Sequence, residues 1–233
     1  MSKVISFSLW GNDPKYSEGM VRNAELAKEL FPDWECWVYV KRNGGFGPVS
    51  TFLELDNMDN VKFMPMHMNA GSQGFATDDW RGMFWRFEPA SNSDVEVMIS
   101  RDCDSRLSMR EKLAVDAWME SDKGFHIMRD HPWHGSAILG GMWGVKCGVL
   151  SDMHQLMSEW DQENRWQTDQ DFLNAIIYPR IADNCMVHAS FCRMEPHARN
   201  FPVPRSGTEF VGQVFDENEE TVIEHVQALA QAL

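Results

Sequence analysis

The sequence has neither closely spaced cysteine pairs nor long hydrophobic runs. It contains five cysteines, an odd number, and none of them lies in a C-x-x-C pair. Neither a disulfide framework nor a zinc ribbon is therefore expected. No window reaches the roughly eighteen apolar residues of a membrane span, and the first residues lack the apolar core of a signal peptide. We therefore expect a reduced, cytoplasmic protein without a transmembrane segment.

Positive charge is also scarce. Lysine and arginine together number 21 against 35 acidic residues, which gives a formal net charge of −14. Such a surface repels nucleic acid and anionic membranes, so neither is an expected partner. A small anionic substrate would need a local group of cations. Five arginines supply a candidate group near the middle of the chain: Arg81, Arg86, Arg101, Arg106 and Arg110.

The first predicted strand is not followed by a glycine-rich phosphate-binding loop. The apolar run from Val4 to Leu9 ends in Trp10-Gly11-Asn12-Asp13-Pro14, which is a turn without the G-x-G-x-x-G pattern. A Rossmann dehydrogenase is therefore disfavoured.

The chain has enough apolar residues for one sizeable domain over residues 1–233. Hydrophobic residues make up 43% of it, with ten tryptophans and fourteen phenylalanines, and no linker or repeat divides it. Strand and helix patterns alternate, which predicts an α/β fold with a mixed, mostly parallel sheet flanked by helices. Strands are expected at 4–9, 35–40, 61–65, 95–100, 125–128 and 185–188, with a further apolar stretch at 137–145. Helices are expected at 16–30, with Met20, Ala24, Ala27 and Phe31 along one face, at 108–121 and at 150–160. Another is expected from a cap at Thr77, with Trp80, Phe84 and Phe87 facing the core, and two more are expected from Thr168 and from Asp216.

The central predicted strand, at 95–100, leads directly into two carboxylates. Asp102 and Asp104 are two residues apart, so an extended backbone places both side chains on one side. Two carboxylates suit one hard divalent cation that keeps open positions for phosphate oxygens. The structural alternative is a polar loop that closes a strand.

Two further features have equally ordinary explanations when taken singly. Thr168 is expected to cap a helix that opens with Asp169-Gln170-Asp171, and acids at a helix start are stabilised by the helix dipole. His188 ends a short strand, where a lone histidine is more often a hydrogen-bonded core residue than a metal ligand.

Together these motifs resemble a known family. The D-C-D after V-E-V-M-I-S-R, the W-R-F-E-P helix that carries Arg86, the Gly140-Gly141 segment and the run D-Q-D-F-L-N occur in that group's order. They resemble nucleotide-sugar-dependent glycosyltransferases of the GT-A fold, and most closely the glycogenin-like and lipopolysaccharide-galactosyltransferase-like group. The resemblance covers about residues 4 to 190.

The resemblance implies a metal site. In that group the D-x-D binds manganese and a late histidine completes the site, which implies Mn²⁺ or Mg²⁺ held by Asp102, Asp104 and His188. The group's ending H-x-x-G-x-K-P-W is absent here, so the third ligand stays open between His188 and His197. An imidazole ligand would favour Mn²⁺ over Mg²⁺.

The resemblance also implies a donor site. Arg86 would face the diphosphate or donor sugar, Asp169 would bind donor hydroxyls, and Gln170 would lie near the anomeric carbon. The resemblance also implies donor contacts at Gly140 and Gly141, although this sequence departs from the group here, with Leu139-Gly140-Gly141 in place of its N-x-G. Ligands of open α/β sheets bind at the carboxyl ends of the strands, so the first turn is expected to border the base and ribose. These turn residues are Ser8, Trp10 and Asn12.

A group of histidines follows the predicted strand at 125–128. His126, His131 and His134 have no standard metal-binding spacing, and Pro132 and Trp133 lie among them. The loop is either an acceptor wall or a structured surface turn.

The sequence therefore predicts a metal-dependent glycosyltransferase. The expected donor is a nucleotide-sugar, with UDP as the nucleotide, and the acceptor is a glycan, a lipid-linked sugar or another hydroxyl compound. One alternative is a nucleotide-sugar or carbohydrate-binding module without turnover. Another is a phosphatase of the haloacid-dehalogenase type, which is disfavoured because Ser105 and Arg106 follow the acid pair.

Overall fold

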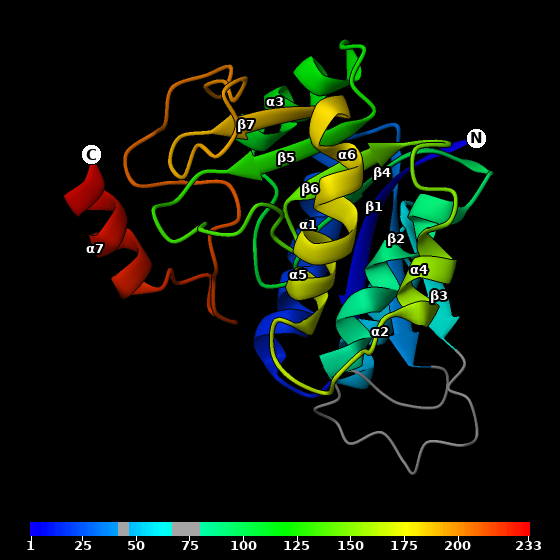
Figure 1. Cartoon of the computed structure of the whole chain (residues 1–233). Helices are drawn as coiled ribbons and strands as arrows, with labels where there is room; N and C mark the ends of the chain where they lie inside the picture. The colour runs from blue at the N-terminus through cyan, green and yellow to red at the C-terminus, as the bar shows by residue number, and fades with distance from the viewer. Residues whose placement is uncertain (42–46, 67–79) are drawn as a thin grey trace.

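A seven-stranded sheet forms the centre of the molecule (Figure 1). The computed structural model describes residues 1–41, 47–66 and 80–233. Within these residues the strand order is β3-β2-β1-β4-β6-β5-β7, and β6 alone runs antiparallel to its neighbours. The predicted mixed, mostly parallel α/β sheet is confirmed. The strands are β1 (Ser2–Leu9), β2 (Trp34–Lys41), β3 (Val61–Met66), β4 (Val95–Ser100), β5 (Phe125–Arg129), β6 (Trp143–Lys146) and β7 (Cys185–Ala189).

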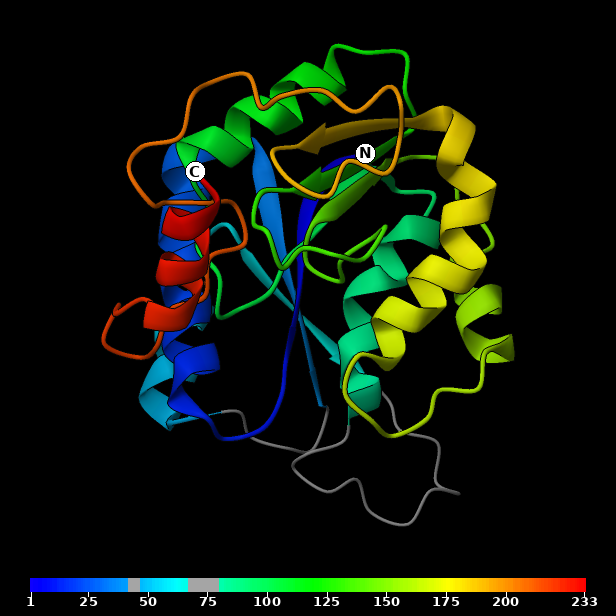
Figure 2. The same ribbon diagram turned by 60° about the vertical axis from the view of Figure 1, so that its left-hand side comes forward.

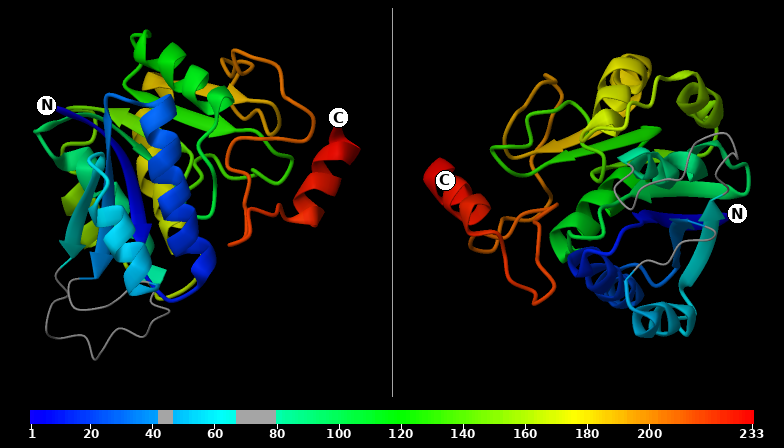
Figure 3. Two further views of the ribbon diagram at one scale, coloured as in Figure 1. Left: turned by 180° about the vertical axis from the view of Figure 1, so that it is seen from behind. Right: turned by 90° about the horizontal axis from the view of Figure 1, so that it is seen from below.

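Helices cover both faces of the sheet, as the opposite views in Figures 1 and 3 show. On one face lie α1 (Pro14–Leu30), α2 (Val49–Asp56) and α3 (Met109–Met119). On the other lie η1 (Trp80–Ser91), α4 (Met153–Glu159), α5 (Thr168–Phe172), η2 (Leu173–Ile177) and α6 (Tyr178–Ile181), followed by η3 (Ala182–Asn184). The last helix, α7 (Ile223–Ala232), lies apart from these layers in Figures 1 and 3, and it overlaps α1 only in the projection of Figure 2. None of the helices in the described ranges has the length and apolar character needed to cross a membrane.

The sequence explains why these elements form where they do. Asp13 caps α1, because its carboxylate accepts the Lys15 backbone N–H at 3.1 Å, and Pro14 fits the first helical position. Met20, Ala24 and Ala27 then form the buried face of α1. Strand β4 is buried on both sides except at Glu96, as expected for a central strand covered by two helical layers.

Several expected elements differ from those observed. The last helix begins at Ile223 rather than at Asp216, because the Asp216 carboxylate accepts the backbone N–H groups of Asn218 and Glu220 and forms a turn. Helix α2 was not expected, and the apolar stretch at 137–145 is extended strand only where β6 begins, at Trp143. Trp80 lines a cleft, although Phe84 and Phe87 are buried as predicted. The predicted cap at Thr77 lies outside the described residues.

The topology brings the candidate motifs to one edge of the sheet. Strands β1 and β4 are parallel neighbours, with Ser6 paired to Ser100, so the turn after β1 and the loop after β4 leave the sheet together. Because β6 is antiparallel, the Gly140-Gly141 segment that precedes it arrives at this same edge. Ligand sites in open α/β sheets are found at this edge.

Candidate functional site

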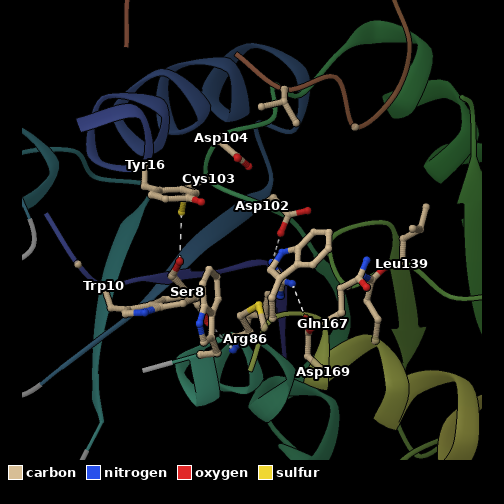
Figure 4. Close-up of a pocket in the computed structure, with 18 of the residues that line it drawn as sticks. Ser8, Trp10, Tyr16, Arg86, Asp102, Cys103, Asp104, Leu139, Gln167 and Asp169 are labelled. Carbon is tan, nitrogen blue, oxygen red and sulfur yellow. Dashed lines mark hydrogen bonds and ion pairs between the residues drawn. The ribbon is translucent and has the colours of Figure 1, made fainter. Parts of the chain in front are cut away.

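A cleft of about 390 Å³ opens at the carboxyl ends of β1 and β4 (Figure 4). This volume lies within the range of small-molecule sites. The cleft contains most of the predicted site residues: Ser8, Trp10, Asn12, Arg86, Asp102, Asp104, Gly140, Asp169 and Gln170 all line it.

Arg86 occupies the floor of the cleft and joins two distant motifs. Its Nη1 donates to the Asp102 carboxylate, and its Nη2 donates to Oδ2 of Asp169 at 2.9 Å. The Ser8 hydroxyl accepts the Arg86 backbone N–H at 3.0 Å. Burial alone would lower the pKa of Arg86, but the two carboxylates raise it, so the guanidinium keeps its charge. Arg86 therefore fixes Asp102 and Asp169 relative to the end of β1.

The two acids of the D-x-D motif have different surroundings. The Asp102 side chain is 44% exposed, whereas that of Asp104 is 15% exposed. Burial and the neighbouring charge of Asp102 raise the pKa of Asp104 to about 6. Lys15 opposes this rise, because its Nζ lies 3.6 Å from Oδ2 of Asp104. Both carboxylates face the cleft, and each has a cation of the chain beside it.

Glycines are required beside these acids because the backbone passes very close to them. A Cβ atom on Gly141 would collide with the carboxyl group of Asp102. One on Gly140 would collide with the Arg86 guanidinium and the Asp169 carboxylate. The Ser100 hydroxyl donates to the Gly140 carbonyl at 2.8 Å and holds the segment in place. Gly141 thus contacts the Asp102 side chain but does not itself line the cleft.

The predicted histidine ligand is not at the site. His188 is buried in β7, with its Nδ1 2.8 Å from Nε2 of His126, and burial lowers its pKa to about 4. His197 is exposed, with its Nε2 3.6 Å from the Cys185 sulfur. Neither lines the cleft, and within the described ranges no three His, Cys, Asp or Glu residues form a metal-binding group. The prediction of a late histidine as third ligand is therefore corrected, and with it goes the reason to prefer Mn²⁺ over Mg²⁺.

The predicted group of arginines is dispersed. Arg101 pairs with Glu111, Arg106 with Glu219, and Arg110 with Asp130, while Arg81 does not line the cleft. Among the described residues, Arg86 is the arginine that faces the cleft. The lining carboxylates are more numerous: Asp13, Asp102, Asp104 and Asp169.

The cleft also contains residues that the motifs did not indicate. Tyr16, Trp80 and Trp166 form aromatic walls, and Gly212 and Val214 come from the segment before α7. This segment is hydrogen-bonded to the loop after β4, since the Phe215 backbone N–H donates to the Asp104 carbonyl at 2.8 Å. Nothing local in the sequence could reveal this, because the contact joins residues far apart in the chain.

Of the three predicted histidines, His126 lies apart, whereas His131 and His134 are neighbours with ring centroids 5.6 Å apart. His126 is buried against His188, and His131 bonds the His225 carbonyl at 2.9 Å. His134 lines the cleft, and its Nδ1 accepts the Asp130 backbone N–H at 3.0 Å. Burial lowers the pKa of His134 to about 3, so its ring is neutral at neutral pH with the proton on Nε2. Of the three, only His134 could contact a ligand in the cleft.

The donor set in the cleft fits a hard divalent cation shared with a ligand. Asp102 and Asp104 supply carboxylate oxygens, and such ions are commonly held by one or two carboxylates, with water and substrate phosphates as further ligands.

Comparison with known proteins identifies the fold. No protein-family model matches the chain, and no curated protein matches its sequence. A glycosyltransferase involved in the glycosylation of the major capsid of PBCV-1 superposes with a TM-score of 0.51 at 14% identity, over 81% of this chain and 82% of that one. The galactosyltransferase LgtC, in complex with donor and acceptor sugar analogs, gives a TM-score of 0.48 at 12% identity, over 100% and 96% of the chains. An active-site mutant of LgtC gives 0.46 at 11% identity, with the same coverage. The chain has the GT-A fold, as the sequence predicted.

Proposed function

We propose that this protein is a divalent-metal-dependent glycosyltransferase whose donor is a nucleotide-sugar, with UDP as the nucleotide. One observation carries the proposal: Arg86 holds Asp102 of the D-x-D motif and Asp169 of the D-Q-D motif in one cleft, at the carboxyl edge of a GT-A sheet. The PBCV-1 protein that shares this fold is a glycosyltransferase.

The charges in the cleft support a need for metal. Four carboxylates line it, against Arg86 and the adjacent Lys15. A diphosphate brings further negative charge, so it would be repelled unless a divalent cation accompanied it. Asp102 and Asp104 would hold that cation, which would neutralise charge on the departing nucleoside diphosphate. Either Mg²⁺ or Mn²⁺ is compatible with two carboxylates.

Different residues of the cleft would contact different parts of the donor. Ser8, Trp10 and Asn12 line the end nearest β1, where we place the nucleoside. Arg86 supplies a fixed, delocalised cation for the developing negative charge. Asp169 and Gln170 lie together at the start of α5, where they would contact the donor sugar. The acceptor, a glycan, a lipid-linked sugar or another hydroxyl compound, would enter beside them.

A nucleotide-binding experiment tests the metal assignment. We expect Asp104→Asn to weaken UDP binding in the presence of Mn²⁺ by on the order of 100-fold, because the bridging cation is lost. Isothermal titration with and without the metal measures this. Asp116→Asn is the matched control, since Asp116 pairs with Lys112 on α3 and does not line the cleft. Equal affinity of the unaltered protein for UDP with and without Mn²⁺ or Mg²⁺ would reject metal dependence.

Turnover separates an enzyme from a binding module. The same residues would serve in both, so binding alone does not discriminate between them. We expect release of UDP from a UDP-sugar when metal is present. Tight UDP-sugar binding without any UDP release, over a panel of sugars and acceptors, would favour the binding module instead.

A further inference from the structure

Lys15 has an unusual position at the edge of the cleft. It lies in the first turn of α1, where its backbone is fixed by the cap at Asp13. Its Nζ is 3.6 Å from Oδ2 of Asp104 and 4.6 Å from the centre of the Tyr16 ring. Tyr16 and Asp104 lie on the same side of the cleft in Figure 4. The ammonium is thus directed towards Asp104, the second acid of the D-x-D motif.

Helix stability does not explain this lysine. The amino end of a helix carries partial positive charge, so a cation in the first turn opposes the helix dipole. The first turn of α1 contains no acidic residue, and the carboxylate of the cap residue Asp13 accepts the Lys15 backbone N–H rather than pairing with the ammonium. The observed partner of the ammonium is instead Asp104, on the loop after β4.

The two acids are therefore neutralised in two different ways. Arg86 is 7% exposed and is also fixed by Asp169 and by the Ser8 hydroxyl. Lys15 is 30% exposed and approaches Asp104 at a longer distance, on a flexible four-carbon stem. Arg86 is paired with two carboxylates, whereas Lys15 is paired with one and is more exposed, so its ammonium is the easier of the two to displace.

We propose that Lys15 is a tethered counter-ion of Asp104, which a divalent cation displaces, and whose released ammonium then binds the diphosphate of the nucleotide. The inference rests on the proposed function, because it requires both a metal and a diphosphate in this cleft. The ammonium and a divalent cation carry like charges, so a cation bound to the Asp104 carboxylate would repel the Lys15 ammonium from it. Once displaced, the tethered ammonium stays within reach of the phosphate oxygens. Lys15 would then disfavour metal without nucleotide and favour the two together.

Two measurements on Lys15→Met test this. Removal of the competitor should tighten binding of Mn²⁺ alone by about 2- to 5-fold, the range expected for a partly exposed ion pair. Loss of the phosphate cation should weaken UDP binding at saturating Mn²⁺ by roughly 5- to 10-fold. Electron paramagnetic resonance of free Mn²⁺ gives the first value, and isothermal titration gives the second. The opposite signs distinguish exchange from a simple loss of structure.

Two further variants serve as controls. Lys15→Arg keeps the charge and should stay close to the unaltered protein in both measurements. Lys28→Met removes an ammonium from the last turn of the same helix, where Lys28 pairs with the exposed Asp59 and not with the D-x-D acids. This variant should change neither value. A thermal unfolding curve for each variant checks that α1 is intact.

The failures of the two proposals are distinguishable. If the unaltered protein binds neither Mn²⁺ nor UDP, the proposed function fails and this inference fails with it. If it binds both but Lys15→Met leaves the Mn²⁺ affinity unchanged or weaker, the exchange alone is overturned. Tighter Mn²⁺ binding with unchanged UDP binding would overturn the phosphate contact.

Discussion

Two groups of titratable side chains in this molecule are both assembled from distant parts of the chain, and they differ in their exposure to solvent. The cleft joins Arg86, Asp102 and Asp169 at the carboxyl edge of the sheet. The second group pairs His126 and His188, on the neighbouring strands β5 and β7, inside the core. Asp102 remains 44% exposed to the cleft, whereas both histidines are buried and have each other as partner.

The difference shows how a functional cluster is distinguished from a structural one. Burial lowers the pKa of both histidines, so the pair is neutral, and the contact between the two rings satisfies one nitrogen on each. The cleft instead holds an excess of carboxylates that face solvent. A ligand could still improve the electrostatics of the cleft, whereas the histidine pair is closed to solvent and to ligands by burial.

Arg86→Ala should have the largest effect on stability. Asp169 is 2% exposed, so removing its guanidinium partner leaves a buried charge unpaired, which costs about 3–5 kcal/mol. Urea unfolding measures the free energy of unfolding. The double variant Arg86→Ala with Asp169→Asn should recover part of the loss, because the buried charge is removed as well. Equal stability of the single and double variants would show that Asp169 is not the buried charge that Arg86→Ala leaves unpaired.

His188→Leu should destabilise the fold without affecting metal binding. The change leaves His126 Nε2 buried without its partner, which costs about 1–3 kcal/mol of unfolding free energy. Adding His126→Phe should restore part of this, since both polar groups are then gone. Mn²⁺ affinity should stay unchanged in His188→Leu, in contrast to Asp104→Asn. If His188→Leu weakened Mn²⁺ binding as much as Asp104→Asn, His188 would have to be a metal ligand.

The histidine pair should also make stability depend on pH. Both pKa values are lower in the folded protein than the ordinary 6.5, and that of His188 falls to about 4. The unfolded chain therefore binds more protons in this window, so stability is full above pH 6.5 and is lost as the pH falls towards 4. The slope is up to about 1.4 kcal/mol per pH unit for each histidine. Urea unfolding across this range should show a shallower slope for the double variant His126→Phe with His188→Leu than for the unaltered protein.

Local patterns predicted much of the fold because each depends on neighbouring residues. The apolar alternation at Val95, Val97 and Ile99 gave β4, and the spacing of Met20, Ala24 and Ala27 gave the buried face of α1. The turn at Asp216 escaped prediction because an aspartate that caps a helix and one that closes a turn look the same in sequence.

The candidate site was predictable only where a motif carried it. Asp102, Asp104 and Asp169 each belong to a short motif, and parallel-sheet topology brings the first two to the edge where Arg86 lies. Val214 reaches the cleft through contacts between residues about a hundred positions apart, and no local pattern encodes such a contact. His188 was misplaced because a strand histidine has the same sequence context whether it faces a cleft or the core.

Gly141→Ala should give the smallest of these effects, and it tests how tightly the cleft is built. A Cβ at this position collides with the Asp102 carboxyl group, so the acid must move relative to the Arg86 guanidinium. We expect UDP binding in the presence of Mn²⁺ to weaken roughly tenfold, since ligand sites tolerate displacements of only about 0.5 Å. Gly135→Ala is the matched control, because a Cβ there meets nothing within 4 Å. Equal UDP affinity of both variants would mean that the Asp102 side chain can shift without cost to binding. The cleft would then not need the precise placement of its acids that the prediction assumes.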